Sequence, residues 1–473
     1  MTAVTHRPLD DPFAGLTPLE AGEIVDRLRA TFASGRTKSL DWRIRQLEGI
    51  ERLVSEREGE IAAALKSDLG RTSHEAWFGD IAPTVGESAY ARKHLRRWMQ
   101  PTRTSLPLSL LPGKGSYHYE PLGTVLVIGP WNYPVYLTLG PMIGGLAAGN
   151  CVVLKPSEYA PATSTLLASL IPHYLDADAV AVVEGAAEAT QLLIDQRLDH
   201  IFFTGGTEIG RKVMQAAAPH LTPVTLELGG KSPVIVTEHA DLDVAARRIA
   251  WVKLLNSGQT CIAPDYLLVE KSVRDDLVSK LRTTIAEFRT GEGPTQPIVN
   301  HRQLARLRSL LDPAPGDVVL GGTTNTGEGD LSLAPTIVVD PDPESDLMTG
   351  EIFGPILPVL TIGSLTEAIA FVNAREKPLA AYIFSNTKAE QDRVIAEVPS
   401  GATVVNHVAM HVLAPQLPFG GVGASGMGAY HGKWGYETFS HRKAVLVKRA
   451  KPDLKLLYPP YSERDKKIMR RLA

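Results

Sequence analysis

Cysteine is scarce in this sequence, since Cys151 and Cys261 are the only two among 473 residues. Two cysteines are too few for a disulfide framework or a four-cysteine zinc site, and their scarcity suits a reducing compartment. Net charge is also small, because 49 Lys and Arg face 52 Asp and Glu to give −3 at pH 7. Bulk charge therefore gives no support for nucleic-acid binding. Any cysteine chemistry must come from a single thiol.

Targeting and membrane-spanning signals are lacking as well. The first residues, MTAVTHRPLDDPF, contain no basic segment leading into an apolar one, so we expect no signal peptide and a cytoplasmic location. Residues 121–154 contain no Asp, Glu, Lys or Arg, but Pro130, Pro134 and Pro141 interrupt them. This stretch predicts two buried strands and a helix rather than a membrane span. The basic end, RDKKIMRRLA, predicts a solvated tail with no membrane anchor.

The length of the chain allows two or three domains, and its hydrophobic pattern predicts their class. Residues 17–99 look helical, because Ile44, Leu47, Ile50, Leu53 and Val54 recur at spacings of three and four. From residue 123 short apolar runs alternate with helical ones, in the order TVLVI, CVVL, AVV, HIFF and VTLEL. A second such series follows residue 229: SPVIV, YLLVE, DVVL, PTIVV, ILPVL, AAYIF and ATVV. We therefore expect two doubly wound α/β domains, with a β-hairpin excursion over 104–119.

Three residues in the connections after predicted elements have side chains suited to catalysis. Cys261, in NSGQTCIAP, follows a helical stretch, where backbone donors could hold a nucleophilic thiol; a buried, inert thiol is the alternative. Glu227, in LELGG, ends a strand and could act as a general base, or be an ion-paired surface residue. Asn132, in PWNYP, could stabilise an oxyanion or simply form a turn. Cys151 lies inside an apolar strand and is expected to be buried and structural.

Residues suited to a dinucleotide follow two other strands. Lys155 and Glu158 stand in LKPSE, and Gly205, Gly206 and Gly210 stand in FFTGGTEIG. Carboxyl ends of parallel strands share one rim of a sheet, and glycines that open a helix let a phosphate approach its N–H groups. Together these words predict a dinucleotide crevice.

Two other patterns are better explained without a ligand. The glycines of GVGASG match a dinucleotide fingerprint, but no strand precedes them in the expected unit, so a tight loop is favoured. His407 and His411 have the spacing of a metal pair on a helix, yet VVNHVAMHV reads as a strand. We therefore predict no metal site.

Taken together, these words resemble the aldehyde dehydrogenase family over essentially the whole chain. The matching segments are PWNYP, LKPSE, FTGGTEIG, LELGGKSP, NSGQTCIAPDY, PTIVVDPDPES, EIFGPILPV and LPFGGVGASGMG, in the order of that family. The words APDY and YHGKWGYETFSHRKAVL resemble its class 3 branch, which oxidises medium-chain aliphatic and aromatic aldehydes. The resemblance implies that Cys261 is the nucleophile, that Asn132 and the Cys261 N–H stabilise the oxyanion, and that Glu227 activates the hydrolytic water.

The resemblance also implies a cofactor and its contacts. The cofactor would be NAD+, with NADP+ as an accepted alternative, because Glu158 favours a free 2′-hydroxyl while class 3 enzymes with the same word accept both. The implied contact residues are Trp131, Lys155, Glu158, Gly205, Gly206, Thr207, Gly210, Glu351 and Phe353.

The implied organisation has three parts. Residues 1–103 and 122–228 would form the NAD(P)-binding domain, 229–418 the catalytic domain, and 104–121 with 419–473 the bridging and oligomerisation segments of a homodimer. Two alternatives are a dehydrogenase that passes its acyl group to coenzyme A and a non-catalytic binding protein on the same scaffold. Relatives of the first kind typically lack the residue equivalent to Glu227, and a binding protein would be expected to lose Cys261 or Glu227.

Overall fold

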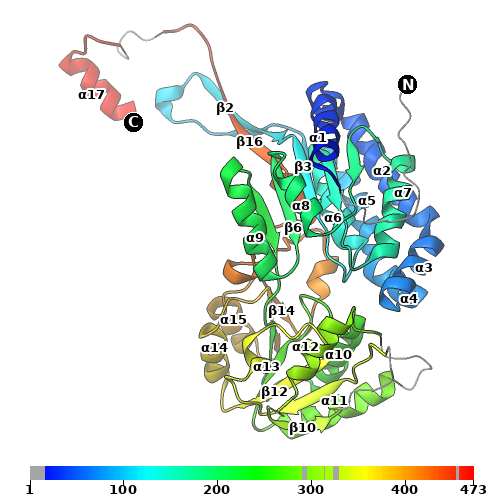
Figure 1. The fold of residues 1–473 in the computed structure, drawn as a ribbon. Helices are drawn as coiled ribbons and strands as arrows, with labels where there is room; N and C mark the ends of the chain where they lie inside the picture. Colours follow the sequence, from blue (N-terminus) through cyan, green and yellow to red (C-terminus); the bar gives the residue numbers. More distant parts are fainter. Residues whose placement is uncertain (1–15, 290–295, 314, 323–329, 454–457, 473) are drawn as a thin grey trace.

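Two helix-covered β-sheets make up most of the molecule in the computed structural model (Figure 1). The structure describes residues 16–289, 296–313, 315–322, 330–453 and 458–472. One sheet has six strands in the order β15-β7-β6-β3-β4-β5, and the other has seven in the order β10-β11-β12-β9-β8-β13-β14. This architecture confirms the predicted pair of α/β layers.

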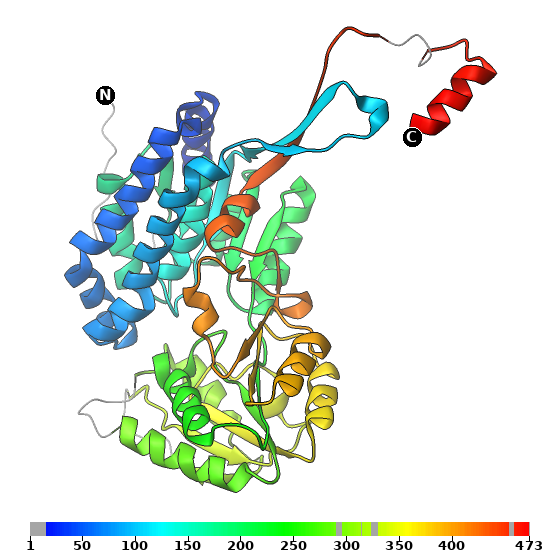
Figure 2. The same cartoon turned by 180° about the vertical axis from the view of Figure 1, so that it is seen from behind.

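The N-terminal helices pack against the six-stranded half of the molecule (Figure 2). They are α1 (Pro18–Ala33), α2 (Leu40–Glu56), α3 (Glu58–Leu69), α4 (Ser73–Ala76) and α5 (Ala82–Trp98). The predicted stripe on α2 is confirmed, because Leu47, Ile50, Leu53 and Val54 are all buried. A five-residue π-helix (Trp77–Ile81) joins α4 to α5. Within this π-helix, Asp80 and Ile81 are buried, whereas Phe78 lines a cavity described below.

The six-stranded sheet contains every strand predicted between residues 124 and 228. Its strands are β3 (Thr124–Ile128), β4 (Cys151–Lys155), β5 (Val180–Val182), β6 (His200–Thr204), β7 (Val224–Glu227) and β15 (Gly426–Met427). Its crossover helices are α6 (Tyr136–Ala148), α7 (Pro161–Tyr174), α8 (Ala187–Ile194) and α9 (Thr207–Ala217). The first five strands are parallel, and the helices that connect parallel strands cover both faces of the sheet. β3, β4 and β6 are therefore buried throughout. β3 lies between β4 and β6, so the chain adds strands first on one side of β3 and then on its other side. Open α/β sheets bind ligands at such a switch in strand order.

The seven-stranded sheet confirms the second predicted series, with one difference at its edge. Its strands are β8 (Pro233–Val236), β9 (Tyr266–Glu270), β10 (Asp317–Leu320), β11 (Thr336–Val339), β12 (Ile356–Ile362), β13 (Ala380–Phe384) and β14 (Ala402–Val405). The helices of this half are α10 (Leu242–Leu254), α11 (Arg274–Phe288), α12 (His301–Ser309), α13 (Asp346–Thr349), α14 (Leu365–Asn373) and α15 (Lys388–Glu397). β10 runs antiparallel to β11, because no helix crosses over between them in the described chain.

A three-stranded sheet projects from the six-stranded half (Figures 1 and 2). It consists of β1 (Thr102–Thr104), β2 (Gly113–Pro121) and β16 (Ser440–Lys448), so the predicted hairpin excursion is present. The sequence assigned 419–473 to bridging and oligomerisation segments and a C-terminal tail, and the described residues of this segment lie in several parts of the molecule. β15 adds an antiparallel strand to β7, and α16 (Gly432–Thr438) packs on α6. Within the described part of 419–473, β16 pairs with β2 and the terminal helix α17 (Glu463–Leu472) lies beyond it.

Candidate active site

Cys261 is held by an unusual stretch of backbone between α10 and β9. Asn256 and Ser257 have left-handed φ angles of 48° and 51°, and Gly258 has 72°. Non-glycine residues pay a conformational cost in this region, and such strain is concentrated at functional sites. The turn carries the chain to Cys261, a residue of intermediate exposure. The sequence had predicted this placement on a connection after a helix.

The environment of the thiol has opposing effects on its pKa. Burial raises the pKa of Cys261, and the nearby charges of Glu351 and Glu227 raise it further. The backbone N–H groups of Cys261 and Ile262 lower it. These two N–H groups are the backbone donors that the sequence analysis expected beside the thiol. Cys151 differs, because it is fully buried in β4, as predicted, and burial raises its pKa to about 12.

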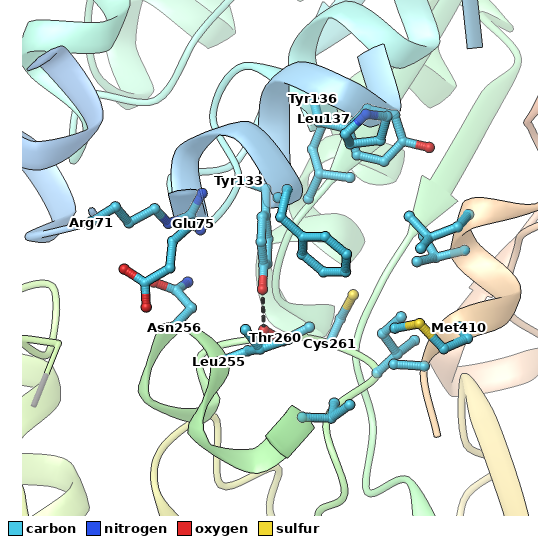
Figure 3. Close-up of a pocket in the computed structure, with 18 of the residues that line it drawn as sticks. Arg71, Glu75, Tyr133, Tyr136, Leu137, Leu255, Asn256, Thr260, Cys261 and Met410 are labelled. Atoms are coloured by element: carbon cyan, nitrogen blue, oxygen red, sulfur yellow. Dashed lines mark hydrogen bonds between the residues drawn. The ribbon is translucent and has the colours of Figure 1, made fainter. Parts of the chain in front are cut away.

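Two cavities meet at Cys261. The first, of about 820 Å³, is drawn in Figure 3, where the Cys261 sulfur lies among its lining side chains. The second, of about 1810 Å³, lies over the carboxyl ends of β3, β4, β6 and β7. Cys261 and Leu137 are the residues that line both. The thiol therefore stands where a molecule in one cavity can face a molecule in the other.

The first cavity has a mainly apolar wall. Its apolar residues are Phe78, Pro83, Leu137, Val252, Leu255, Ile262, Ala409, Met410, Val412, Leu413 and Phe419. Arg71, Glu75 and Asn256 supply polar groups, and the Tyr133 hydroxyl is hydrogen-bonded to Thr260 at 2.9 Å (Figure 3). A concave apolar site with a few polar groups is the usual form of a small-molecule pocket.

Asn132 is fixed in the loop between β3 and α6. Its side-chain amide donates to the backbone carbonyl of Gln259 at 3.1 Å, and it is 3 % exposed. Its own backbone carbonyl accepts from the Asn256 side chain at 3.0 Å and from Arg71. Arg71 is in turn ion-paired with buried Asp80 of the π-helix. The structure thus brings Asn132 to the loop that carries Cys261.

Glu227 ends β7 and lines the second cavity together with Cys261. It is 3 % exposed, and neither carboxylate oxygen has a hydrogen-bond partner among the described residues. Burial therefore raises the pKa of Glu227 well above its usual value. A buried, unpartnered carboxyl beside a thiol is suited to accepting a proton from water. The alternative of an ion-paired surface residue is excluded.

The second cavity brings together most of the residues expected to contact a dinucleotide. Those that line it are Trp131, Lys155, Glu158, Gly205, Gly206, Glu351 and Phe353. Lys155 donates to Glu158 at 2.8 Å, and the rings of Trp131 and Phe353 meet edge to face at 5.4 Å. A Cβ at Gly206 would meet no atom within 4 Å, so open space lies at the start of α9. This cradle fits a pyrophosphate at a helix N-terminus.

Two of the expected contact residues do not line this cavity. Thr207 begins α9, but its hydroxyl is directed to the Ala424 carbonyl at 3.4 Å. Gly210 is buried one turn into α9, where an added Cβ would collide with Leu228 at 2.6 Å. Gly210 therefore allows α9 to pack closely on the end of β7. Its effect on a ligand would act through the position of the helix.

Comparison with known proteins identifies the family. The model of the aldehyde dehydrogenase family matches residues 13–445. The chain belongs to the aldehyde dehydrogenase family. It is 47 % identical over 445 residues to the rat "Aldehyde dehydrogenase, dimeric NADP-preferring", covering 93 % of this chain and 97 % of the relative. It is also 47 % identical to rat "Aldehyde dehydrogenase family 3 member A2", covering 93 % and 91 %.

Solved structures agree with this assignment. The substrate-bound state of Staphylococcus aureus AldH superposes with a TM-score of 0.91 at 42 % identity, covering 95 % of this chain and 99 % of that one. The protein is thus an NAD(P)-dependent aldehyde dehydrogenase that oxidises an aldehyde to a carboxylic acid. The family resemblance drawn from the sequence is confirmed.

Several residues around the dehydrogenase site were not found by sequence reasoning. Arg71, Asp80 and Asn256 hold the Asn132 loop, and Phe78 and Glu75 line the first cavity. The π-helix separates the roles of neighbouring residues, since Phe78 lines the cavity while Asp80 is buried. No local pattern marks these residues. A buried Arg–Asp pair becomes visible only when distant segments are packed together.

The two patterns set aside in the sequence are loops in this dehydrogenase. GVGASG forms a tight turn with a 3-10 helix over Gly423–Ser425. β14 ends at Val405, so His407 lies in a loop and His411 in a 3-10 helix (Met410–Leu413), and the expectation of a strand there was wrong. Among the described residues no cluster of three or more His, Cys, Asp or Glu is arranged to hold a metal. In the same part of the chain no helix is both long enough and apolar enough to cross a membrane.

Proposed function

We propose that Cys261 is the nucleophile of this aldehyde dehydrogenase. Its thiolate adds to the carbonyl carbon of the aldehyde to form a thiohemiacetal. When bound, NAD(P)+ accepts the hydride lost from that carbon, which leaves an acyl thioester on Cys261. Water then adds to the thioester, releasing the carboxylic acid and restoring the thiol. The observation that carries this proposal is the position of Cys261 in the walls of both cavities.

Two residues assist in this proposal. Asn132 and the backbone N–H of Cys261 stabilise the negative oxygen that develops on the substrate, which is supported by the fixed position of the Asn132 amide. Glu227 takes the proton from the water that attacks the thioester. The support for this role is its buried carboxyl, whose oxygens have no hydrogen-bond partner among the described residues and whose raised pKa makes the carboxylate form a stronger base.

We assign the second cavity to the cofactor. Lys155 and Glu158 would hold the adenosine ribose, while Glu351, Phe353 and Trp131 would hold the nicotinamide end. The glycines Gly205 and Gly206 would hold the pyrophosphate at the start of α9, with Thr207 at the first turn and Gly210 setting the approach of the helix. Residues 1–103 and 122–228 would thus be the cofactor-binding domain and 229–418 the catalytic domain. Most of the residues that line this cavity belong to the six-stranded half, which supports the division, and Cys261, Glu351 and Phe353 are among those that come from the other half.

The substrate class is proposed from the first cavity. The mainly apolar wall of this cavity favours medium-chain aliphatic or aromatic aldehydes over small polar ones. One of the two rat relatives is named as a member of family 3, and the other is called dimeric. We infer a homodimer whose bridging and oligomerisation parts lie within 104–121 and 419–473, and a cytoplasmic location. Use of NADP+ beside NAD+ is supported by the name of the dimeric rat relative, which is called NADP-preferring.

The proposal is tested by comparing the two thiols. Cys261→Ala is expected to reduce NADH formation from a medium-chain or aromatic aldehyde by at least about 1,000-fold, since no second nucleophile is proposed. Cys151→Ala is the matched control and is expected to retain activity, because its thiol is buried in β4. Activity of Cys261→Ala equal to that of the parent enzyme would contradict the mechanism.

A further inference from the structure

Glu351 reaches the cofactor cavity from a loop that has no regular structure of its own. The loop follows α13 and precedes β12. The Glu351 carboxylate lies so close to Gly229 that a Cβ there would collide with it, and the backbone N–H of Gly230 faces it and lowers its pKa. The carboxylate therefore bridges the catalytic half to the linker between β7 and β8. Its position depends on whatever holds the loop.

Lys231 holds one side of this loop. Its ammonium group donates to the backbone carbonyls of Leu347 and Gly350, both at 2.9 Å. Its third hydrogen bond, of 2.5 Å, goes to the Asp265 carboxylate. All three ammonium protons are thereby engaged, and the side chain is 10 % exposed. Glu351 follows directly after one of the two carbonyls that Lys231 binds.

Asp265 holds the other side of the loop. Its second carboxylate oxygen accepts from the backbone N–H of Ile352 at 3.0 Å. Lys231 and Asp265 precede β8 and β9, which are neighbouring parallel strands in the order β12-β9-β8. From the amino ends of two neighbouring strands, the pair therefore binds the residues on either side of Glu351, which are Gly350 and Ile352. Arg306 adds a bond to the Ile352 carbonyl at 2.7 Å.

The charges of the pair act on Glu351 as well. Burial raises the pKa of Glu351 to about 8, the Asp265 charge adds to this rise, and Lys231 and Arg306 oppose it. Neither Lys231 nor Asp265 is among the described residues that line the two cavities. Both are therefore placed to act on the site through Glu351, without touching a ligand.

We propose that the Lys231–Asp265 pair is the positioning device that holds Glu351 in the cofactor cavity and thereby determines affinity for the dinucleotide. The inference rests on the proposed assignment of that cavity to NAD(P)+. Lys231 and Asp265 are positioning residues, and we call this pair the clamp. Disrupting the pair should release the Glu351 loop and weaken NAD+ binding, while the turn over residues 256–258 that carries Cys261 stays in place.

The test is a double-mutant cycle on NAD+ affinity. Lys231→Met and Glu351→Gln are each expected to raise the Kd for NAD+ by about tenfold or more, and the double variant should be no weaker than Glu351→Gln alone. Affinity is measured by calorimetry in the Cys261→Ala background, so that the result does not depend on catalysis. The rate of iodoacetamide alkylation of Cys261, measured with the thiol present, should agree within about twofold between Lys231→Met and Glu351→Gln, because both variants take the Glu351 charge away from the thiol. A merely structural effect of Lys231→Met would move its rate away from that of Glu351→Gln.

Matched variants make the result decisive. Lys280→Met removes a surface lysine paired with Asp243 at 2.7 Å, and it should leave the Kd unchanged. Gly229→Ala should raise the Kd by displacing the Glu351 carboxylate while the clamp stays intact. If Lys231→Met does not fold, Asp265→Asn takes its place in the cycle. The proposal would be overturned by an unchanged Kd for NAD+ in the Lys231 or Asp265 variant. It would also be overturned if the fold-increase in Kd of the double variant equalled the product of the two single fold-increases.

The same measurements separate this inference from the proposed function. If NAD+ binds the Cys261→Ala protein and none of the variants that line the second cavity alters the Kd, the cofactor assignment itself fails. If Glu351→Gln and Gly229→Ala weaken binding but Lys231→Met and Asp265→Asn do not, the assignment stands and the clamp is wrong.

Discussion

The side chain of Asn132 donates a hydrogen bond of 3.1 Å to the backbone carbonyl of Gln259, two residues before Cys261. This bond joins the loop after β3 to the loop after α10, so the two halves of the molecule meet at the thiol. An amide nitrogen has two hydrogens, and one bond to Gln259 leaves the other for a substrate oxygen.

Removal of this donor should affect the chemical step. Asn132→Ala is expected to lower kcat/KM for the aldehyde by about 100- to 1,000-fold, as for other oxyanion donors. Steady-state kinetics at saturating NAD+ measure this loss. Asn373→Ala is the control, because that amide binds the Glu397 carbonyl on the surface of the catalytic half. An Asn132 variant with unaltered kcat/KM would remove this residue from the mechanism.

Glu227 should govern the release of the acid. In Glu227→Gln the acylation steps remain and water is no longer activated, so a burst of NADH should precede a steady state about 100-fold slower than that of the parent. Stopped-flow absorbance measures both phases. Loss of the initial burst together with the steady-state rate would instead place Glu227 before the thioester.

The same residue predicts a pH dependence. Because burial raises the pKa of Glu227, its carboxyl holds a proton well above the usual range and becomes a base only as the pH rises. Deacylation in the parent should therefore increase with pH through that raised pKa. In Glu227→Gln this increase should disappear.

Glu158 should influence the choice between the two dinucleotides. Its carboxylate accepts from Lys155 at 2.8 Å in the cavity assigned to the cofactor, where a negative charge would repel a 2′-phosphate. Glu158→Gln is expected to raise the ratio of kcat/KM for NADP+ to that for NAD+ by about tenfold. Glu367→Gln, on α14 of the catalytic half, should leave the ratio unchanged. A ratio that stays constant in Glu158→Gln would mean that another residue determines selectivity.

His411 should make folding sensitive to acid. Neither ring nitrogen has a hydrogen-bond partner among the described residues, and burial lowers its pKa to about 4. The unfolded chain takes up the proton near the ordinary histidine pKa of 6.5, so the stability contribution of neutral His411 is full above that pH and is lost as the pH falls toward 4.

A substitution isolates this effect. His411 stacks on Phe419 at 5.5 Å, and His411→Phe keeps an aromatic ring there. We expect the variant to gain about 1–3 kcal/mol over the parent between pH 7 and pH 4.5. Urea unfolding at the two pH values gives the difference, in which the other histidines largely cancel. A difference that does not change with pH would exclude His411 as the source.

The sequence was most informative where a residue's role is local. The strand Thr124–Ile128 and its parallel neighbours are runs of buried apolar residues, so their pattern marks them directly. Short antiparallel pairings were not predicted, because β15 has two residues and is defined only by its contact with β7. This is why the segment 419–473 was assigned as one unit.

The candidate site divides in the same way. The motif residues Cys261, Glu227 and Asn132 converge as the sequence suggested. The wall of the first cavity could not be predicted, because Phe78 from the π-helix and Met410 from a 3-10 helix distant in sequence come to line it together only after folding. The contact expected of Gly210 is replaced by packing against Leu228, since a motif shows which residues recur and not which of them face the ligand.

The shared wall at Cys261 also bears on inhibition. A compound that fills the apolar cavity and modifies the thiol would compete with the aldehyde while the dinucleotide cavity stays open, and a nucleotide analogue would do the reverse. A single molecule with an apolar arm, an electrophile and a nucleotide arm would occupy both. Because the two arms would be joined through the electrophile that reacts with the sulfur, binding of one arm would raise the effective concentration of the other arm at its own cavity.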